Sequence, residues 1–139
     1  MCIRDRRQAI KSANLNPADV DYINAHGTGT EQNDLVEMRG IRHALGSAAD
    51  QVAVSASKSM IGHLVNAAGG VELAITVLAQ RDGYAPPTIN LKDVDPACTF
   101  DCLPLTGRRM NFEYAIKLSH KNKTNLICIT SSLLMKRVL

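Results

Sequence analysis

Two histidines and a lysine stand where short apolar segments end and helical segments begin. His26 follows the segment DYINA, and Lys58 and His63 follow the segment VAVSAS. If these segments are neighbouring parallel strands, both loops emerge at the same edge of a sheet, where α/β proteins usually bind ligands. A neutral imidazole can donate a hydrogen bond to a carbonyl oxygen that becomes negative, and an ammonium adds favourable charge. A loop histidine taken alone is more often structural, so this prediction requires the three side chains to converge.

The segment that follows His63 carries one isolated charge. Between Leu64 and Gln80 nearly every residue is apolar, and Glu72 is the only charged side chain. A segment that is apolar on almost every side predicts a buried helix, in which a carboxylate is costly unless it is paired. Lys58 is the nearest cation in the sequence and is the predicted partner. The alternative is a glutamate exposed on a partly buried helix, because Glu is rarely fully buried.

The elements that must position these residues alternate between strand and helix. Residues 21–25 and 51–57 predict two short strands, and the later segments MNFEYAI and NLICITSSLLMKRV predict two more. The segment RRQAIKSANL has helical character. A second helix is predicted from Glu31, with Thr30 as its N-cap and Gly46 as its stop. The apolar face of that helix consists of Leu35, Met38, Ile41 and Leu45. The alternation favours a layered α/β fold.

Length and composition indicate a single globular domain. The chain has 139 residues and a net charge of +3, which is too small to indicate binding to nucleic acid or to a membrane surface. It has no apolar run of the ~20 residues that span a bilayer, and no signal peptide is visible. We therefore expect a cytoplasmic protein. The lysines that follow Gly107 are expected to be solvated.

The four cysteines predict neither a disulfide framework nor a metal site. Cys2, Cys98, Cys102 and Cys128 have no regular spacing, so free thiols are expected in a chain without an export signal. Together with His120, the last three match none of the usual spacings of structural zinc sites, and no metal is expected.

Three motifs carry a resemblance to a known family. The segments DYINAHGTGTEQND, SKSMIGHLVNAAGGVELAITVLA and PPTINL resemble the C-terminal half of a β-ketoacyl-acyl carrier protein synthase, in particular the type II elongating condensing enzyme. The resemblance runs from about Arg7 to Tyr114 in the family's own order. It implies the C-terminal half of a thiolase fold, which is a layered α/β architecture. It also implies that residues 7–139 form one thiolase-like half domain.

The resemblance assigns a role to each candidate residue. It implies a decarboxylative Claisen condensation of malonyl-carrier protein with an acyl thioester in fatty acid biosynthesis. His26 and His63 would hold the malonyl thioester carbonyl, Lys58 would support this pair, and Glu72 would be the acid paired with that region. Thr28 and Thr30 would hold the phosphopantetheine arm. The family uses no cofactor of its own, because its substrates are carried on the phosphopantetheine of acyl carrier protein. That carrier protein is the implied partner, and the full-length parent is expected to be a homodimer.

The chain departs from the family in three places. The nucleophilic cysteine lies in the family's first half, and none of the four cysteines here stands in its setting. The closing loop of the NSFGFGG type is replaced by KLSHKNKT, so the tail from about residue 117 is atypical. The glycine at the centre of HGTGT is common in polyketide synthases, which blurs the substrate class. Residues 1–6, MCIRDR, have no evident packing role and are predicted to be a non-native leader.

Two other functions remain open at this point. One is a non-catalytic partner subunit that resembles a chain-length factor, and the other is the ketosynthase of a polyketide system. Retention of His26, Lys58 and His63 together disfavours the non-catalytic subunit. The isolated chain is expected to be inactive, because it lacks the nucleophile.

Overall fold

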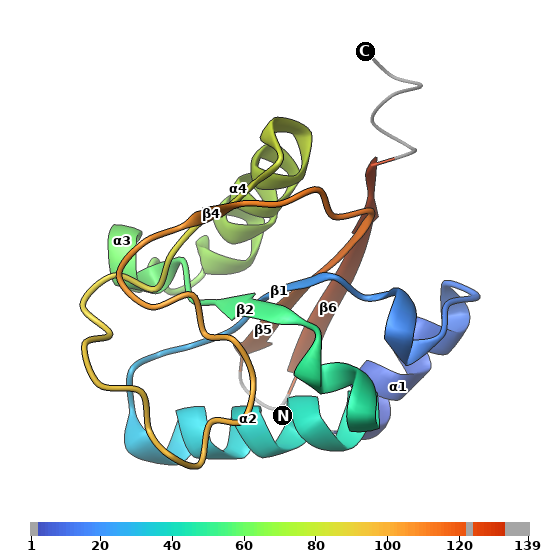
Figure 1. Ribbon diagram of the computed structural model, residues 1–139, viewed down its shortest axis with the longest axis horizontal. Coiled ribbons are helices and arrows are strands. Elements are labelled where there is room, and N and C mark those ends of the chain that lie inside the picture. Colours follow the sequence, from blue (N-terminus) through green and yellow to red (C-terminus); the bar gives the residue numbers. More distant parts are fainter. Residues whose placement is uncertain (1–2, 122–123, 133–139) are drawn as a thin grey trace.

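The protein is a four-stranded mixed sheet with helices on both faces (Figure 1). The computed structural model describes residues 3–121 and 124–132. The strand order is β2 (Ala53–Ser55), β1 (Tyr22–Asn24), β5 (Tyr114–Lys121) and β6 (Thr124–Ser131). Strand β1 is parallel to both β2 and β5, and β5 is antiparallel to β6. The predicted α/β class is therefore confirmed, and so is the parallel pairing of the two strands that precede the histidine loops.

The two strands before the histidine loops lie within their predicted segments, whereas the strand predicted at MNFEYAI begins only at its Tyr114 and continues through Lys121. The main sheet consists of β1 (Tyr22–Asn24), β2 (Ala53–Ser55), β5 (Tyr114–Lys121) and β6 (Thr124–Ser131). A small second sheet pairs β3 (Tyr84–Ala85) with β4 (Arg108–Arg109). Within the main sheet, Tyr22 is in register with Ala53 of β2 and Ala115 of β5.

The helices are α1 (Ile3–Ser12), α2 (Glu31–Leu45), α3 (Lys58–Ile61) and α4 (Ala68–Asp82), with short 3₁₀ helices at Pro17–Asp19 and Gly46–Asp50. The predicted bounds of α2 are confirmed. Gly46, which follows its last residue, has a φ of +62°, a conformation that glycine adopts without a steric cost. Helix α4 starts later than expected, because Leu64–Ala67 precede its first turn.

The two faces of the sheet pack against different helices (Figure 1). Successive residues of a strand point to opposite faces, so Ile23 contributes to the core under α1 and α2, while Tyr22 faces the core on the α4 side. The first core includes Ile10, Ile41, Val54, Phe100, Ile116 and Leu118. The second includes Ala53, Ala79, Leu103, Phe112 and Ala115. Both faces of the short central strands are thus covered.

Helix α4 buries its polar residues and exposes part of its apolar surface. Glu72, Thr76 and Gln80 are buried at four-residue spacing, whereas Val71 and Leu78 are 39% and 47% exposed. The predicted all-round burial is therefore wrong for this chain. The physical reason is that the polar residues bind the sheet: Gln80 Nε2 donates to the carbonyl of Glu113 at 2.6 Å.

The first described residues are part of the fold. Ile3 to Arg6 form the first turn of α1, and the Arg6 side chain is buried beside Glu37 of α2, with 3.9 Å between Nη2 and Oε1. A Cβ at Gly40 would collide with the Arg6 guanidinium, so the glycine makes room for it. The expected lack of packing within residues 1–6 is wrong for Arg6, while residues 1–2 lie outside the described residues. That this segment is a non-native leader stays a prediction.

The tail forms the β5–β6 hairpin, as far as it is described. Strand alternation points Ile116 and Leu118 toward α1 and α2, and it turns Lys117 toward α4, where its side chain is fully buried. The expectation of solvated lysines in this region is therefore wrong for Lys117. Residues 122–123 and 133–139 of the predicted tail lie outside the described residues. Within the part of the chain that is described, no helix is long and apolar enough to cross a bilayer.

Candidate active site

The two histidine loops converge at one edge of the sheet, as predicted. The rings of His26 and His63 meet edge to face, with 5.9 Å between their centroids. Lys58 begins α3 directly after β2, and its Nζ lies 3.4 Å from Nδ1 of His26. His26 is 5% exposed and His63 is exposed, so the pair consists of one buried and one accessible imidazole.

A buried carboxylate holds the backbone of the His26 loop. Oε1 and Oε2 of Glu37 accept hydrogen bonds of 2.8 Å from the backbone N–H groups of His26 and Gly27. Glu37 lies on α2, so the helix that follows the loop also fixes it. Gly27 has a φ of +44°, and a Cβ there would collide with the Cβ of Ala56. Glycine is thus required at this position by both conformation and space.

Three buried charges lie behind His26. Glu72 has 2.7 Å contacts with two lysines, through Oε1 to Nζ of Lys58 and through Oε2 to Nζ of Lys117. The predicted pairing of Glu72 with Lys58 is confirmed, and the exposed-glutamate alternative is wrong, because Glu72 has 0% exposure. Lys58 also donates to the backbone carbonyl of His26 at 2.5 Å. Lys117 donates to the carbonyl of Ala25 at 3.1 Å. The cluster therefore joins α3, α4 and β5 to the end of β1.

The surroundings keep His26 neutral. Burial lowers its pKa to about 4, and the positive charges of Lys58 and Lys117 act in the same direction. Burial also lowers the pKa of Lys117 to about 8, although the Glu72 carboxylate opposes this. Near neutral pH the site therefore combines an uncharged imidazole with a local excess of positive charge from two ammonium groups and one carboxylate.

In both imidazoles, Nδ1 faces a hydrogen-bond donor. Nδ1 of His63 accepts a hydrogen bond from the backbone N–H of Val65 at 3.0 Å. Nδ1 of His26 faces the Lys58 ammonium, which can only donate. A neutral imidazole that accepts at Nδ1 carries its proton on Nε2. The pair therefore offers two Nε2–H donors, which is the arrangement that stabilises a developing oxyanion.

The two threonines of the loop contact each other. Oγ1 of Thr28 lies 2.9 Å from Oγ1 of Thr30, and Thr30 is exposed. Thr30 occupies the predicted N-cap position of α2, but its side chain makes no capping hydrogen bond. Both hydroxyls thus stand on the loop beside His26, at the solvent side of the site.

Several residues of the site were not predicted from the sequence. Asn24 of β1 donates through its Nδ2 to Oγ of Ser57, the residue before α3, at 2.8 Å, and to Oγ1 of Thr76 on α4 at 3.0 Å. The ring of His120 lies 6.2 Å from that of His26, centroid to centroid, and brings a third imidazole to the site from β5. The burial of Glu37 could have been predicted from the sequence, because it precedes the apolar residue Ile41 by one helical turn and so lies on the same face of the helix.

The structure gives no metal-binding group of three or more His, Cys, Asp or Glu side chains within residues 3–121 and 124–132. What these residues do form is a hydrogen-bonding and electrostatic site built from His26, His63 and Lys58. Its supporting residues, Glu37, Glu72 and Lys117, are all buried.

The buried cluster predicts a large stability effect at Glu72. Glu72→Ala would leave two buried ammonium groups without their counter-charge, so we expect the free energy of unfolding to fall by roughly 3–5 kcal/mol. Urea melts of the two proteins measure this difference. Asp93→Ala removes an exposed carboxylate and serves as the control, with an expected change within about 0.5 kcal/mol. An equally small change for Glu72→Ala would contradict the account of the cluster.

The amino-acid sequence is similar to those of known proteins. Residues 3–92 match the family described as "Beta-ketoacyl synthase, C-terminal domain". The chain is 48% identical over 109 residues to 3-oxoacyl-[acyl-carrier-protein] synthase 2 of Vibrio harveyi, which covers 78% of this chain and 26% of that protein. It is 49% identical over 102 residues to a putative polyketide beta-ketoacyl synthase 1 of Streptomyces virginiae, with 73% and 24% covered. The chain thus spans about a quarter of the length of these relatives.

Solved structures share the fold. One match is a chain in the structure of a type II polyketide synthase acyl carrier protein in complex with its ketosynthase bound to the hexaketide. The two chains superpose with a TM-score of 0.87 and 34% identity, and the match covers 93% of this chain and 32% of the other. A beta-ketoacyl synthase from Burkholderia phymatum gives a TM-score of 0.84 at 28% identity, covering 91% and 31%. The predicted thiolase-like fold is confirmed by these ketosynthases. The chain belongs to the β-ketoacyl synthase family, of which it carries the C-terminal domain.

Proposed function

We propose that this chain supplies the decarboxylating half of a β-ketoacyl-acyl carrier protein synthase active site. The observation that carries the proposal is the pair of imidazoles, His26 and His63, with their ring centroids 5.9 Å apart and Nδ1 of each facing a donor. Two Nε2–H groups can then bind one thioester oxygen. The reaction is a decarboxylative Claisen condensation of a malonyl thioester with an acyl thioester.

The proposed chemistry needs donors that do not lose their protons. When the malonyl group loses carbon dioxide, the electrons of the broken C–C bond pass to the α-carbon and to the thioester oxygen. Neutral imidazoles stabilise this enolate by hydrogen bonding, whereas an imidazolium would protonate it. The lowered pKa of His26 supports this role, because the ring stays neutral well below physiological pH. The α-carbon then attacks the acyl thioester, and the thiolate that held the acyl group leaves.

Lys58 acts through its neighbours in this proposal. Its ammonium donates to the backbone carbonyl of His26 and faces Nδ1 of the same residue, and it forms an ion pair with Glu72. The two ammonium groups of Lys58 and Lys117 against one carboxylate leave a positive field near the enolate. Because the cluster is buried, this field is weakly screened by solvent.

The substrate carrier is proposed to be acyl carrier protein. The Thr28 and Thr30 hydroxyls would bind the phosphopantetheine arm, which reaches the site past Gly27 and Gly29. Support comes from their position beside His26 and from a structural neighbour that is a ketosynthase in complex with an acyl carrier protein. The substrates arrive on this arm, so the proposal includes no resident cofactor or metal. The full-length parent is proposed to be a homodimer.

Relatives from fatty acid and polyketide synthesis are similar to the chain to the same degree, at 48% and 49% identity. The proposal is therefore the condensing step that both classes share. A non-catalytic subunit of the chain-length-factor type is disfavoured, because His26, His63 and Lys58 are all present and placed together.

The proposed reaction also needs residues from outside this chain. The nucleophilic cysteine is assigned to the other half of the parent protein. The exposed face of α4, which we define by Val71 and Leu78, is proposed to pack against that half. The two residues are about two helical turns apart and so share one side of α4, and apolar side chains left exposed together are typical of an interface.

The first functional prediction concerns the two histidines. The matching 109 residues of the Vibrio harveyi enzyme are replaced by those of this chain, and His26→Ala or His63→Ala is then introduced. We expect malonyl-carrier protein decarboxylation to slow by ~10²–10³, because one oxyanion donor is lost. Acylation of the cysteine should fall much less. Release of labelled carbon dioxide and formation of acyl-enzyme are measured separately.

His43→Ala is the matched control, since His43 is exposed on α2, and both half-reactions should be unchanged in it. An inactive parent chimaera, or an equal loss of both half-reactions in the histidine variants, would refute the assigned role.

The second functional prediction concerns the chain alone. Without the nucleophile it should form no acyl-enzyme when incubated with radiolabelled acyl-carrier protein. Its exposed α4 face should cause self-association, detected by size-exclusion chromatography at low salt. Val71→Gln with Leu78→Gln should reduce that association, because both residues belong to this face.

Val36→Gln is the control for association, since Val36 is 50% exposed on α2 and away from the α4 face. It should leave the elution profile unchanged. Covalent labelling of any cysteine, or a monomer that elutes alike in all variants, would show that the missing half is not needed as proposed.

A further inference from the structure

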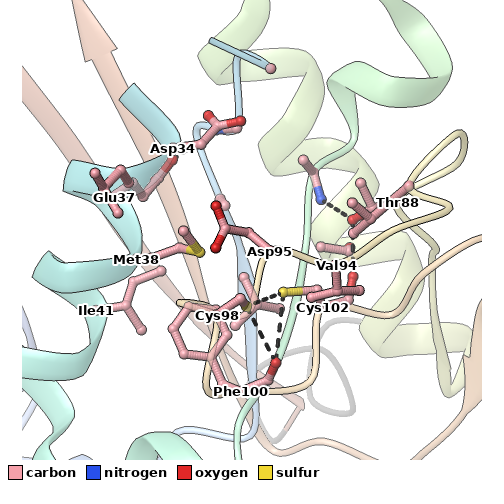
Figure 2. Close-up of a pocket in the computed structure, with 18 of the residues that line it drawn as sticks. Asp34, Glu37, Met38, Ile41, Thr88, Val94, Asp95, Cys98, Phe100 and Cys102 are labelled. Atoms are coloured by element: carbon pink, nitrogen blue, oxygen red, sulfur yellow. Dashed lines mark hydrogen bonds between the residues drawn. The ribbon is translucent and has the colours of Figure 1, made fainter. Parts of the chain in front are cut away.

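Two cysteines meet in a loop outside the imidazole site. Sγ of Cys98 and Sγ of Cys102 lie 2.6 Å apart, and both face the carbonyl oxygen of Phe100, at 3.5 Å and 3.6 Å (Figure 2). A disulfide bond measures ~2.05 Å, so only a small movement separates this pair from a covalent link. Both thiols are present as free cysteines and are half-buried. Cys128 is also free, whereas Cys2 lies outside the described residues.

The loop that carries the thiols is held from both sides. Arg42 of α2 donates to the carbonyl of Thr99 at 3.0 Å and also binds its hydroxyl. Val54 of β2 donates to the carbonyl of Asp101 at 2.8 Å. Thr88 Oγ1 donates to the carbonyl of Cys102 at 3.1 Å. These contacts restrain the backbone on each side of the pair, so the thiols meet because the fold positions them.

The pair lines a cavity of about 450 Å³ between the loop and α2. Figure 2 shows Met38 and Ile41 of α2 on one side of this cavity and the two thiols on the other. Four carboxylates that are not fully buried also line it, namely Glu31, Asp34, Asp93 and Asp95, and no lysine or arginine is among its lining residues in the described part of the chain. A small reagent that approaches the thiols through this cavity therefore meets an excess of negative charge.

The two thiols are chemically unequal. The hydrogen bond from Cys102 lowers the pKa of Cys98 to about 7. Burial opposes this shift, while a backbone hydrogen bond at Phe100 and the positive charge of Arg42 add to it. The same hydrogen bond, together with burial, raises the pKa of Cys102. Cys98 is therefore the thiol of the pair that ionises first, and Cys102 the one that keeps its proton. Thiolate is the form that attacks a disulfide.

We propose that Cys98 and Cys102 form a reversible dithiol–disulfide couple that reacts with small, positively charged organic disulfides. The Cys98 thiolate attacks one sulfur of the reagent, which forms a mixed disulfide on Cys98 and releases one thiolate. Cys102 then loses its proton and attacks Sγ of Cys98. The Cys98–Cys102 disulfide forms and the second thiolate leaves. The protein dithiol loses two electrons, and the reagent disulfide gains them to become two thiols.

The carboxylates that line the cavity should make the reaction rate depend on the charge of the reagent. Exposed carboxylates raise the local concentration of cations and lower that of anions. A dicationic disulfide such as cystamine should therefore react faster than the dianionic dithiodipropionate, which has a similar size. The cavity also reaches Gly27 and Gly29 of the histidine loop, so a group attached to Cys98 would lie against that loop's backbone.

The test uses the full 139-residue chain with Cys2→Ser and Cys128→Ser, so that only the pair can react. Trypsin leaves both cysteines in one peptide, residues 93–108, because Lys92 and Arg108 are the flanking cleavage sites. After cystamine treatment we expect this peptide to be lighter by two hydrogens, and dithiothreitol should restore its mass. Adding Cys102→Ser should stop the reaction at a cysteamine adduct on Cys98. Adding Cys98→Ser should slow adduct formation about tenfold, as expected when the remaining thiol is mostly protonated.

Two further measurements test the role of the fold. Cystamine should react about tenfold faster than dithiodipropionate at low salt, and Asp93→Asn with Asp95→Asn should reduce this ratio. In concentrated urea the difference in rate between the Cys98→Ser and Cys102→Ser chains should disappear. The proposal is overturned if the two single-cysteine chains react equally fast in native buffer. It is also overturned if a cysteamine adduct persists when both thiols are present, or if the disulfide formed joins two chains.

Discussion

The buried carboxylate of Glu72 organises this domain. Glu72 lies at the interface of α4 and the sheet with no solvent exposure, and its charge is balanced by Lys58 and Lys117. A buried charge that loses its partners costs several kcal/mol, so α3, α4 and β5 must keep the positions that bring these three groups together. Lys58 also binds the carbonyl of His26 and faces its Nδ1, so the same constraint orients the imidazole. Burial of the ring, with the charges of Lys58 and Lys117 acting in the same direction, lowers its pKa and keeps it neutral.

Helix α2, on the opposite face of the sheet, also fixes the position of the His26 loop. Glu37 on α2 accepts the backbone N–H groups of His26 and Gly27, so the loop is held by a carboxylate on one side and by an ammonium on the other. Both supports come from helices that directly follow the two short parallel strands. The site thus depends on the parallel pairing of β1 and β2, which brings the two strand ends to one edge. These contacts explain how a short, glycine-rich loop such as HGTGT can hold the His26 side chain in a defined position.

The sequence predicted those parts of the site that follow local rules. An isolated glutamate in an apolar helix indicates a buried partner, and strand–loop–helix repeats indicate that His26 and His63 share an edge. Lys117 was missed because its partner is 45 residues away in the sequence and because its burial depends on strand alternation in a segment rich in basic residues. The orientation of α4 was missed for a related reason. Its buried face is polar, since Thr76 and Gln80 bind groups of the sheet that the sequence alone does not place.

The most direct test of this account is the titration of His26, followed by NMR in chain labelled with ¹⁵N-histidine. The unfolded chain should protonate this ring near pH ~6.5, whereas burial beside two ammonium groups lowers the pKa in the folded state to about 4. Proton binding therefore favours the unfolded state between these values, and stability contributed by His26 is lost as the pH falls through this window. We predict ¹⁵N shifts of a neutral ring protonated on Nε2 from pH 8 to about pH 5. A midpoint near 6.5, or a proton on Nδ1, would contradict the claim that the buried cluster prepares His26 as an oxyanion donor.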